Sequence, residues 1–370
     1  MAAMLIQSQN DNVNNDEWAE RCAYWTELTQ LEIPTRKRRE QQSQPLILTG
    51  HGLSIRVDKG RLLIRDGITH YPQQRQEHVF FKGSLDIPPR IILLDGFGTI
   101  TLDALDWIAE QNSALIRVKW NGQFFSLISN GGQAADPVKF AWQIKAREDE
   151  GEKLTFYLPL MEGKLANTLG TLADYLSPSA AKERAIEKIR LYLHRLQNDP
   201  PNKLKMLLGI EAQVASLYFA AWRELKINWK TSRRYPIPNE WRSFYSRGSL
   251  KMKNKGGANI FATHPVNAML NYAYTVLLGQ TQLQVIADGY DPMLGVIHTR
   301  SRSQHGPPRP SFAIDMMEPM RPVVDRVILK LVAEERFSGA DFDLQSNGVV
   351  RLNPELARII AQRNPSNLGL

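Results

Sequence analysis

Short hydrophobic runs bounded by turn residues dominate residues 46–134. Strands are predicted at LILTG, LSIRV, RLLIRD, HVFF and RIILLD and over Ala114–Trp120 and Gln123–Ile128, because each is a short run rich in β-branched and apolar residues. Asp58-Lys59-Gly60 and Asn121-Gly122 each stand between two such runs and predict hairpin turns. One helix is predicted over Leu102–Gln111, with Thr101 as its N-cap. This pattern predicts a β-rich N-terminal domain.

The hydrophobic period changes after Asn130–Asp136 (NGGQAAD), where we place the domain boundary. From Pro137 onward, apolar residues recur at helical spacing over most of the remaining chain. A hairpin is expected near Asp341–Leu352, with Asn347-Gly348 as its turn. The predicted fold class is therefore α+β, with a larger all-α domain over residues 137–370. The clearest helices are Lys139–Glu150, Leu160–Leu176, Ala180–Gln197, Lys203–Ile227, Pro265–Gly279 and Pro322–Phe337.

Residues 1–45 are polar, rich in Asn and Gln, and lack a sustained core pattern. We predict a flexible N-terminal extension here. The basic run over 36–39 fits a solvated linker better than a phosphate site. A short helix over 16–31 is compatible with apolar side chains that recur at helical spacing, namely Trp18, Cys22, Trp25 and Leu28.

The 370-residue chain carries a net charge of +8 and has an isoelectric point of about 9.4. A basic balance favours nucleic acid or an acidic surface as the partner. Cys22 is the only cysteine, which excludes internal disulfides and cysteine-based zinc clusters. No apolar run reaches about 18 residues and no secretory signal pattern is present, so we expect no membrane span and a cytoplasmic location.

The excess of positive charge is concentrated in Trp222–Lys255, where ten basic residues face only Glu224 and Glu240. Aromatic residues are interleaved with the basic ones. Cations for phosphates and rings for unstacked bases are what a DNA groove requires. The alternative is a solvated basic surface around core aromatics. The predicted DNA-binding residues are Arg223, Lys230, Arg233, Arg234, Arg242, Arg247, Lys251, Lys253 and Lys255, with Arg300 and Arg302 in a second basic segment.

Glu211 is predicted to lie in the apolar stripe of a helix. Its neighbours at three and four positions are Leu207, Leu208, Val214 and Ala215. A buried carboxylate requires a metal ion, a cationic side chain or a proton. The pattern therefore leaves two equal alternatives for Glu211, which are a metal ligand and the partner of a nearby lysine or arginine.

His298 follows the apolar segment Met293–Ile297. A lone histidine in such a place is more often a hydrogen-bonded structural residue than a ligand. Neutral imidazole does bind divalent transition metals well. His298 is therefore a candidate ligand whose alternative is structural.

The segment Ser311–Pro319 (SFAIDMMEP) places Asp315 and Glu318 on one face if it is helical. Two close carboxylates repel each other unless a cation or a shared proton intervenes. The alternative is a pair of acids at a helix N-terminus, with Arg321 as partner. Two or three carboxylates and one imidazole would suit Mg²⁺ or Mn²⁺.

Five segments, in this order, make the sequence similar to a known family: LTGHGLSIRVDKGRLLIRDG, LLGIEAQVASLYFAAW, THPVNAMLNYAYTVLL, GYDPMLGVIHT and SFAIDMMEPMRPVVDR. Over about residues 46–360 the chain resembles the CRISPR-associated endonuclease/integrase of the adaptation module. The resemblance implies a metal site with catalytic residues Glu211, His298 and Glu318, and with Asp315 as a secondary ligand. One departure is His264, since the family usually has Asp or a similar residue before the Pro-Val-Asn motif.

The resemblance also implies a homodimer joined mainly through the β-rich domains, and assembly with a small ferredoxin-like adaptation partner. The sequence therefore predicts a Mg²⁺- or Mn²⁺-dependent integrase in a prokaryotic cytoplasm. Its reaction would insert spacer precursor DNA into CRISPR repeats by 3′-hydroxyl attack on a phosphodiester. No ATPase-type phosphate loop is present, and this transesterification needs none. The alternatives are a non-catalytic DNA-binding scaffold subunit and a mobile-element integrase with the same domain.

Overall fold

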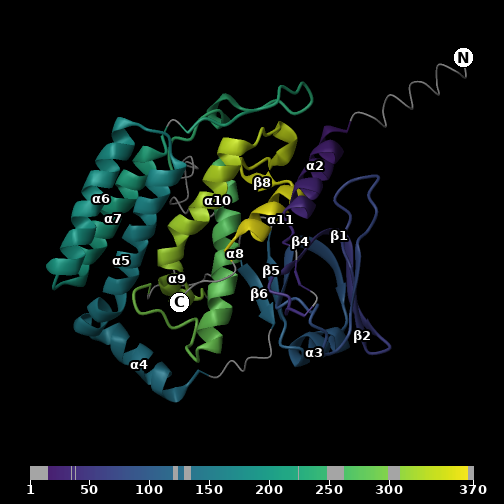
Figure 1. Cartoon of the computed structure of the whole chain (residues 1–370), viewed down its shortest axis with the longest axis horizontal. Helices are drawn as coiled ribbons and strands as arrows, with labels where there is room; N and C mark the ends of the chain where they lie inside the picture. Colours follow the sequence, from purple (N-terminus) through teal and green to yellow (C-terminus); the bar gives the residue numbers. More distant parts are fainter. Residues whose placement is uncertain are drawn as a thin grey trace, which may run out of the picture.

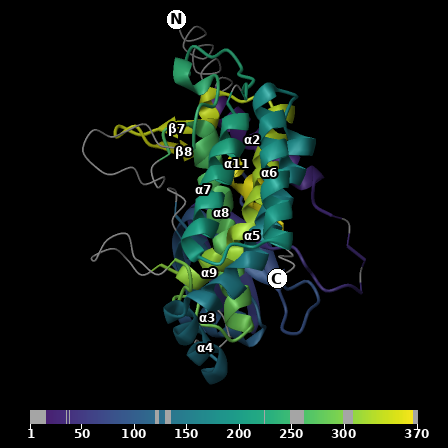
Figure 2. The same cartoon turned by 90° about the vertical axis from the view of Figure 1, so that its left-hand side faces the viewer.

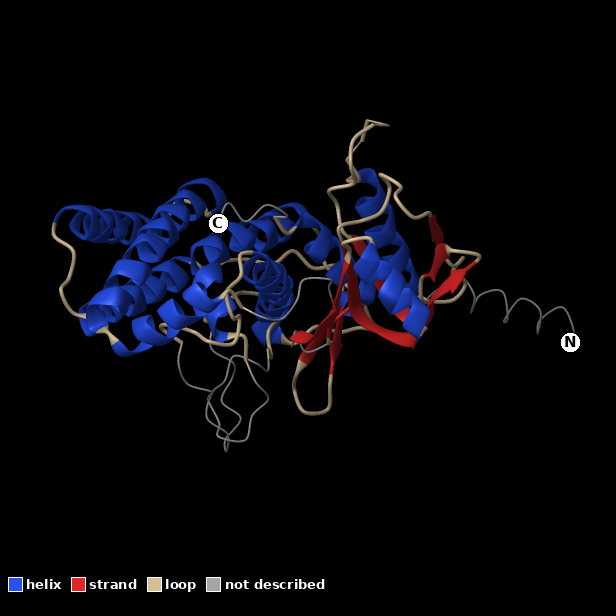
Figure 3. Cartoon of the chain, turned by 90° about the horizontal axis from the view of Figure 1, so that it is seen from below, coloured by secondary structure: helices blue, strands red, loops and turns tan. Residues whose placement is uncertain are grey.

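The structure, a computed structural model, describes residues 16–34, 36–37, 39–119, 124–128, 135–223, 225–247, 262–298 and 309–365. A part built on a β-sheet stands beside a larger helical part, as Figure 1 and Figure 3 show. This arrangement confirms the predicted α+β class, with the six-stranded sheet in the first part of the chain and most of the helices after it.

The sheet of the N-terminal part has six strands in the order β3-β2-β1-β4-β5-β6. The central strand β1 pairs antiparallel with β2 and parallel with β4, and β4 pairs parallel with β5. The outer pairs, β2 with β3 and β5 with β6, are antiparallel. The strands are β1 (Leu46–Asp58), β2 (Arg61–Arg65), β3 (Glu77–Phe80), β4 (Arg90–Ile100), β5 (Ala114–Val118) and β6 (Phe124–Ile128).

Two strands expected at the start of the sheet are one continuous strand, β1. Gly50 and Gly52 both adopt positive φ, and the register with β4 shifts at this point. A Cβ atom at Gly50 would lie 2.8 Å from the backbone of Gly67 and Ile68, so no side chain fits. The glycines therefore bend the strand instead of ending it, as in a β-bulge.

The predicted helix after the fourth strand is present as α3 (Leu102–Glu110). Its buried residues Trp107 and Ile108 pack with Leu48 and Ile64 of the sheet. Thr101 is the N-cap by position, but its side chain makes no capping hydrogen bond. Apolar packing on the sheet therefore accounts for this helix better than the cap does.

The helical part is built around α8, most of whose residues are buried and which runs through the middle of the molecule in Figure 1. It packs against α9, α10, α11 and the strands β5 and β6. Figure 2 shows α3 and α4 at one end of the molecule and the β7–β8 hairpin toward the other. The elements are α4 (Pro137–Glu148), α5 (Glu150–Tyr175), α6 (Ala180–Asn198), α7 (Leu204–Ala221), η1 (Asn239–Trp241), α8 (Pro265–Ala287), α9 (Ser311–Met317), η2 (Glu318–Met320), α10 (Arg321–Glu334), η3 (Gly339–Asp341), β7 (Phe342–Leu344), β8 (Val350–Leu352) and α11 (Pro354–Arg363).

Several helices differ from the sequence prediction, and α8 continues to Ala287, eight residues beyond the expected end at Gly279. Helix α5 begins at Glu150, ten residues before the expected start, and contains Pro159 in its interior. Helix α7 ends at Ala221, because the chain beyond it makes extended backbone bonds, including one from the amide of Ile227 to the carbonyl of Arg242. Helix α11 was not predicted, and it connects the two parts by packing on β1, β4 and α8.

The N-terminal extension contains a docked helix, α2 (Glu17–Leu31), which packs on α11. Arg21, Cys22 and Trp25 are buried in it, and both Arg21 Nε and Trp25 Nε1 lie 2.7 Å from Asp341 Oδ1. The expectation of a flexible extension is therefore wrong for this segment. Its charged and aromatic residues face a buried carboxylate, which composition alone did not indicate.

Helix α7 is the one described helix whose length and composition would suffice to span a membrane. Such helices are equally typical of a protein core, and α7 packs against α5 and α6. It also carries Glu211, which pairs with a lysine of α5. We therefore describe α7 as a helix of the helical part.

Candidate metal and DNA site

The side chains of Glu211 and Glu318 meet at one lysine. Glu211 comes from α7 and Glu318 from η2, and the ammonium group of Lys164 on α5 lies between them. Its Nζ atom is 2.6 Å from Glu211 Oε1 and 2.7 Å from Glu318 Oε2. The structure thus brings together two acids that are more than 100 positions apart in the sequence, as the site prediction requires.

Each of the four carboxylate oxygens in this pair has a protein donor. The second oxygen of Glu211 accepts a hydrogen bond of 2.9 Å from the hydroxyl of Tyr157. The second oxygen of Glu318 lies 3.2 Å from the guanidinium of Arg321. The cationic partners that the sequence analysis kept as alternatives for both acids are therefore present, as Lys164 and Arg321.

These cations hold the pair in its charged form. Burial alone would raise the pKa of Glu318, but Arg321 and Lys164 outweigh it and lower that pKa to about 2. Burial likewise opposes the charge of Lys164, yet the two glutamates raise its pKa above the ordinary value. Glu318 and Lys164 therefore hold each other in their charged forms at neutral pH.

His298 is held by Asp315, whose side chain has no exposed surface. Oδ1 of Asp315 lies 2.6 Å from His298 Nδ1 and 3.0 Å from the amide nitrogen of His298. Oδ2 accepts from the amides of Val296 and Ile297 at 2.7 and 3.0 Å. A carboxylate oxygen accepts this bond, so Nδ1 is the donor, and in the neutral imidazole Nε2 is the nitrogen that carries the lone pair. Asp315 therefore orients the imidazole and has no oxygen left unpaired.

The donor set fits a hard divalent cation. Two carboxylates and an imidazole with a free Nε2 lone pair are ligands suited to Mg²⁺ or Mn²⁺. A histidine fixed through its other nitrogen by a carboxylate is the usual arrangement behind a metal-binding imidazole. Among the residues that the structure describes, no three acidic, histidine or cysteine side chains are grouped closely enough to hold a metal. Lys164 occupies the space between the two glutamates instead.

A buried network extends from Arg321 behind the site. The guanidinium groups of Arg321 and Arg247 each lie 5.3 Å from the ring centre of Tyr274. The hydroxyls of Tyr274 and Tyr218 donate to Asp325 at 2.6 and 2.9 Å. Burial raises the pKa of Asp325 to about 6, although these hydroxyls favour its ionised form. The network fixes Arg321 against the site and against the helix core.

Sequence reasoning missed Lys164, Tyr157 and the Tyr274–Asp325 pair. One signal was available for Lys164, since its helical neighbours Met161, Leu165 and Thr168 are buried. A lysine in an apolar stripe needs an acidic partner, by the argument that was applied to Glu211. No periodicity could have shown that its partner is Glu211, because α5 and α7 meet only in the tertiary fold.

Most described members of the predicted DNA-binding set lie on the surface. Arg223, Lys230, Arg233, Arg234 and Arg242 are exposed. Arg247 is different, because its guanidinium donates to Asn267 and Asn271 at 3.1 and 2.9 Å and is drawn into the helical part. The positions of Lys251, Lys253, Lys255, Arg300 and Arg302 lie outside the described residues.

The interleaved aromatic residues are mainly core residues. Trp222, Trp241 and Phe244 are buried, so the expectation that they stack on bases is wrong for these three. Tyr245 is 66% exposed and Tyr235 is half-buried. The alternative of a basic surface over core aromatics therefore describes this segment better.

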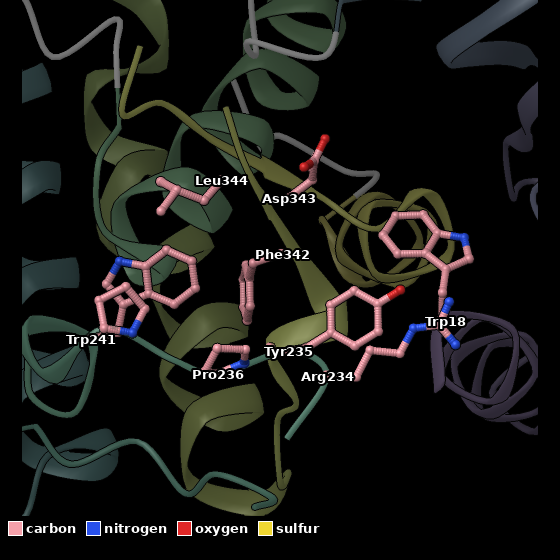
Figure 4. Close-up of a pocket in the computed structure, with 10 residues that line it drawn as sticks. Trp18, Arg234, Tyr235, Pro236, Trp241, Phe342, Asp343 and Leu344 are labelled. Atoms are coloured by element: carbon pink, nitrogen blue, oxygen red, sulfur yellow. The ribbon is translucent and has the colours of Figure 1, made fainter. Parts of the chain in front are cut away.

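A cavity of about 420 Å³ borders the basic segment. Figure 4 shows Trp18 of the N-terminal helix α2 at one side of the cavity, and Tyr235 and Phe342 also line the cavity. The cavity does not include the glutamate pair. Its lining residues are Trp18, Arg234, Tyr235, Pro236, Pro238, Trp241, Gly339, Phe342, Asp343 and Leu344.

His264 caps the central helix α8. Its Nδ1 atom accepts from the amide of Val266 at 3.2 Å, and burial lowers the pKa of His264 to about 4. A neutral imidazole can therefore do the work of an acidic N-cap residue here. The departure noted in the sequence is thus an exchange of one helix cap for another, away from the glutamate pair.

The fold and the site can be compared with known proteins. The chain superposes on a casposase bound to integration product with a TM-score of 0.64 at 25% identity, covering 86% of this chain and 80% of that one. A CAS1 protein from Thermotoga maritima gives a TM-score of 0.59 at 14% identity, covering 87% of this chain and 90% of that one, which shows a shared fold.

The sequence comparisons agree on one family. The model of CRISPR associated protein Cas1 matches residues 46–364, and the chain therefore belongs to the Cas1 family. A CRISPR-associated endonuclease Cas1 of Archaeoglobus fulgidus is 25% identical over 328 residues, 85% of each chain. Another, of Thermus thermophilus, is 28% identical over 310 residues, 83% of this chain and 81% of the relative. This confirms the resemblance, and helix α2 lies outside the matched region.

Proposed function

We propose that the protein is a metal-dependent DNA endonuclease and integrase that inserts spacer DNA into CRISPR repeats. The observation that carries the proposal is the meeting of Glu211 and Glu318 at a single cation, with His298, held by Asp315, close enough to act on the charge of Glu318. A chain that only scaffolds DNA has no need to bring two acids to one cation, with one of the acids buried, because a buried charge is costly to keep. The endonuclease relatives support the same activity.

In this proposal Glu211, Glu318 and the Nε2 atom of His298 are the ligands. A divalent cation held there would supply positive charge against the reacting phosphate and acidify a 3′-hydroxyl or a water. Asp315 keeps the proton of His298 on Nδ1 and so keeps Nε2 available. Arg321, already beside Glu318, is placed to add a fixed positive charge near a phosphodiester.

DNA would be held by the exposed basic residues after α7, which include Arg223, Lys230 and Arg242. The DNA would be a spacer precursor and a CRISPR repeat. We further infer a homodimer formed through the β-rich part, a small ferredoxin-like adaptation partner, and action in a prokaryotic cytoplasm. A chain of a Cas6-RT-Cas1–Cas2 complex shares the fold over 32% of its length and 88% of this chain, with a TM-score of 0.56 at 17% identity.

A mobile-element integrase is the second candidate. The casposase likeness favours it, because that structure contains an integration product and matches most of this chain. Both candidates use the same chemistry and differ in the DNA they join. Integration into a repeat-containing plasmid, compared with a plasmid without repeats, separates them by the position of the insertion.

The activity is tested by strand joining with purified protein. A labelled duplex with free 3′-hydroxyls is incubated with supercoiled plasmid and Mn²⁺ or Mg²⁺, with the wild type and with Glu211→Gln. We expect joined product that requires both the ion and Glu211, with DNA affinity unchanged in the variant. Glu187→Gln, an exposed change on α6, is the matched control and should join DNA normally. Equal joining by Glu211→Gln would remove the proposed site.

A further inference from the structure

Lys164 is the group that the proposed metal chemistry leaves without a role. It lies on α5, where its side chain is 14% exposed, and no other lysine in the described parts of the chain contacts two acids of the site. A lysine whose single ammonium bridges two carboxylates at 2.6 and 2.7 Å holds the position between them. That position is the one from which a cation contacts both glutamates at once.

The charge balance of the site explains why the bridge forms. Glu211 and Glu318 would repel each other across the space between α7 and η2 if no cation stood there. Arg321 pairs with Glu318, whereas the contacts of Glu211 are the neutral hydroxyl of Tyr157 and the ammonium of Lys164. Among the residues that the structure describes, Lys164 is therefore the one side chain that forms an ion pair with Glu211, and it also holds Glu318.

We propose, on the basis of the proposed metal-dependent function, that Lys164 is a built-in counter-ion that keeps the two ligands together and that a divalent cation must displace. A flexible four-carbon stem lets an ammonium withdraw without moving the helix that carries it. The ammonium then remains beside the site as a mobile cation. Lys164 is thus a positioning residue that competes with the metal, and not a ligand.

The direction of the effect separates this role from a purely structural one. If Lys164 competes with the metal, its removal raises metal affinity. The incoming ion then displaces no ammonium group, and the negative charge of the two glutamates is no longer offset by Lys164. Removing a purely structural support lowers metal affinity, because the ligands move apart. For Lys164→Met we expect Mn²⁺ to bind at least about tenfold more tightly than to the wild type. The unfolding temperature without metal should fall, and its rise on adding Mn²⁺ should exceed that of the wild type.

The test is Mn²⁺ binding to the full-length protein without DNA, measured by calorimetry and by electron paramagnetic resonance of free Mn²⁺. The variants are Lys164→Met, Glu211→Gln and, as a matched control, Lys330→Met, which removes an exposed lysine of α10. Tighter Mn²⁺ binding by Lys164→Met, with Lys330→Met unchanged, supports the proposal.

Two other results would contradict it. Mn²⁺ binding that is equal or weaker in Lys164→Met, yet lost in Glu211→Gln, overturns the role of Lys164 and leaves the metal site standing. No Glu211-dependent binding in any variant overturns the metal site and, with it, this role. Circular dichroism verifies that Lys164→Met is folded, and Lys164→Arg, which keeps the charge, should bind Mn²⁺ no more tightly than the wild type.

Discussion

Replacing Asp315 by asparagine is a sharp test of how the site is positioned. The aspartate is fully buried, and its two oxygens accept four hydrogen bonds, three from backbone amides and one from the ring of His298. An asparagine keeps one acceptor oxygen, which can serve two of the four donors. Its NH₂ group is itself a donor and would face the other two donors without accepting from them. Two of the four charge-assisted bonds are therefore lost, which costs about 3–5 kcal/mol of folding free energy.

The same substitution also changes the proton position on His298. If the new amide group faces the ring, it donates to Nδ1 and forces the proton onto Nε2, which then has no lone pair for a metal. If it faces the amides of Val296 and Ile297, the loop itself loses its acceptor. Either orientation weakens Mn²⁺ binding together with stability.

Urea unfolding at neutral pH, followed by circular dichroism, measures the free energy of unfolding. Asp174→Asn is the control, since Asp174 is exposed on α5 and should change stability by less than about 0.5 kcal/mol. A loss of less than about 1 kcal/mol in Asp315→Asn, with unchanged Mn²⁺ affinity, would refute the assigned hydrogen bonds. Loss of stability with unchanged Mn²⁺ affinity would refute only the argument about the proton on His298.

Three further predictions follow from the described contacts. The pKa of Glu318 is about 2 in the folded protein, below the ordinary value. Ionised Glu318 therefore stabilises the fold fully above about pH 4.5, and this stabilisation is lost as the pH falls through 2. Urea unfolding across this pH range should show a contribution of about 3 kcal/mol to the free energy of unfolding in the wild type and none in Glu318→Gln. Arg21→Met leaves the buried carboxylate of Asp341 without its cation. The free energy of unfolding in urea should therefore fall by about 3–5 kcal/mol. A fall below about 1 kcal/mol would show that the Arg21–Asp341 pair does not anchor α2. Alanine at both Lys230 and Arg233 should lower the slope of log affinity for DNA against log salt by about 2, whereas an unchanged slope would mean that neither contacts a phosphate.

Local patterns in the sequence were sufficient for most of the elements. Short apolar runs predicted β2, β3, β5 and β6 to within two residues of their ends, and helical periodicity predicted α6 over Ala180–Asn198 within one residue. The largest errors were at Pro159, after Gly279 and after Ala221. Proline lowers helix propensity locally, but packing on α6 and α7 keeps α5 continuous. The apolar residues after Ala221 continue the helical period, while their backbone amides find extended partners.

The site was predictable only in part, because its acids are visible locally and their partners are not. Glu211 and Glu318 stood out since each interrupts an apolar stretch. Lys164 lies on a helix 47 positions before Glu211, and only the tertiary fold shows that its ammonium stands between the two acids. Asp315 was expected as a secondary ligand, and the distances instead point to a role in orienting His298. Sequence spacing gives the face of a helix but not the partner that this face meets.

The central claim is that Glu211, His298 and Glu318 carry out phosphodiester transfer on DNA. The most direct measurement uses a branched duplex that mimics the product of one strand transfer, incubated with purified protein and Mn²⁺. The reverse reaction releases the branch and reseals the target strand, so it tests the chemistry without target capture. We predict resealed strand with the wild type, and none with Glu211→Gln or without the ion. Resealed strand that forms equally with Glu211→Gln, or bound branched DNA that yields none with the wild type and Mn²⁺, would contradict the account.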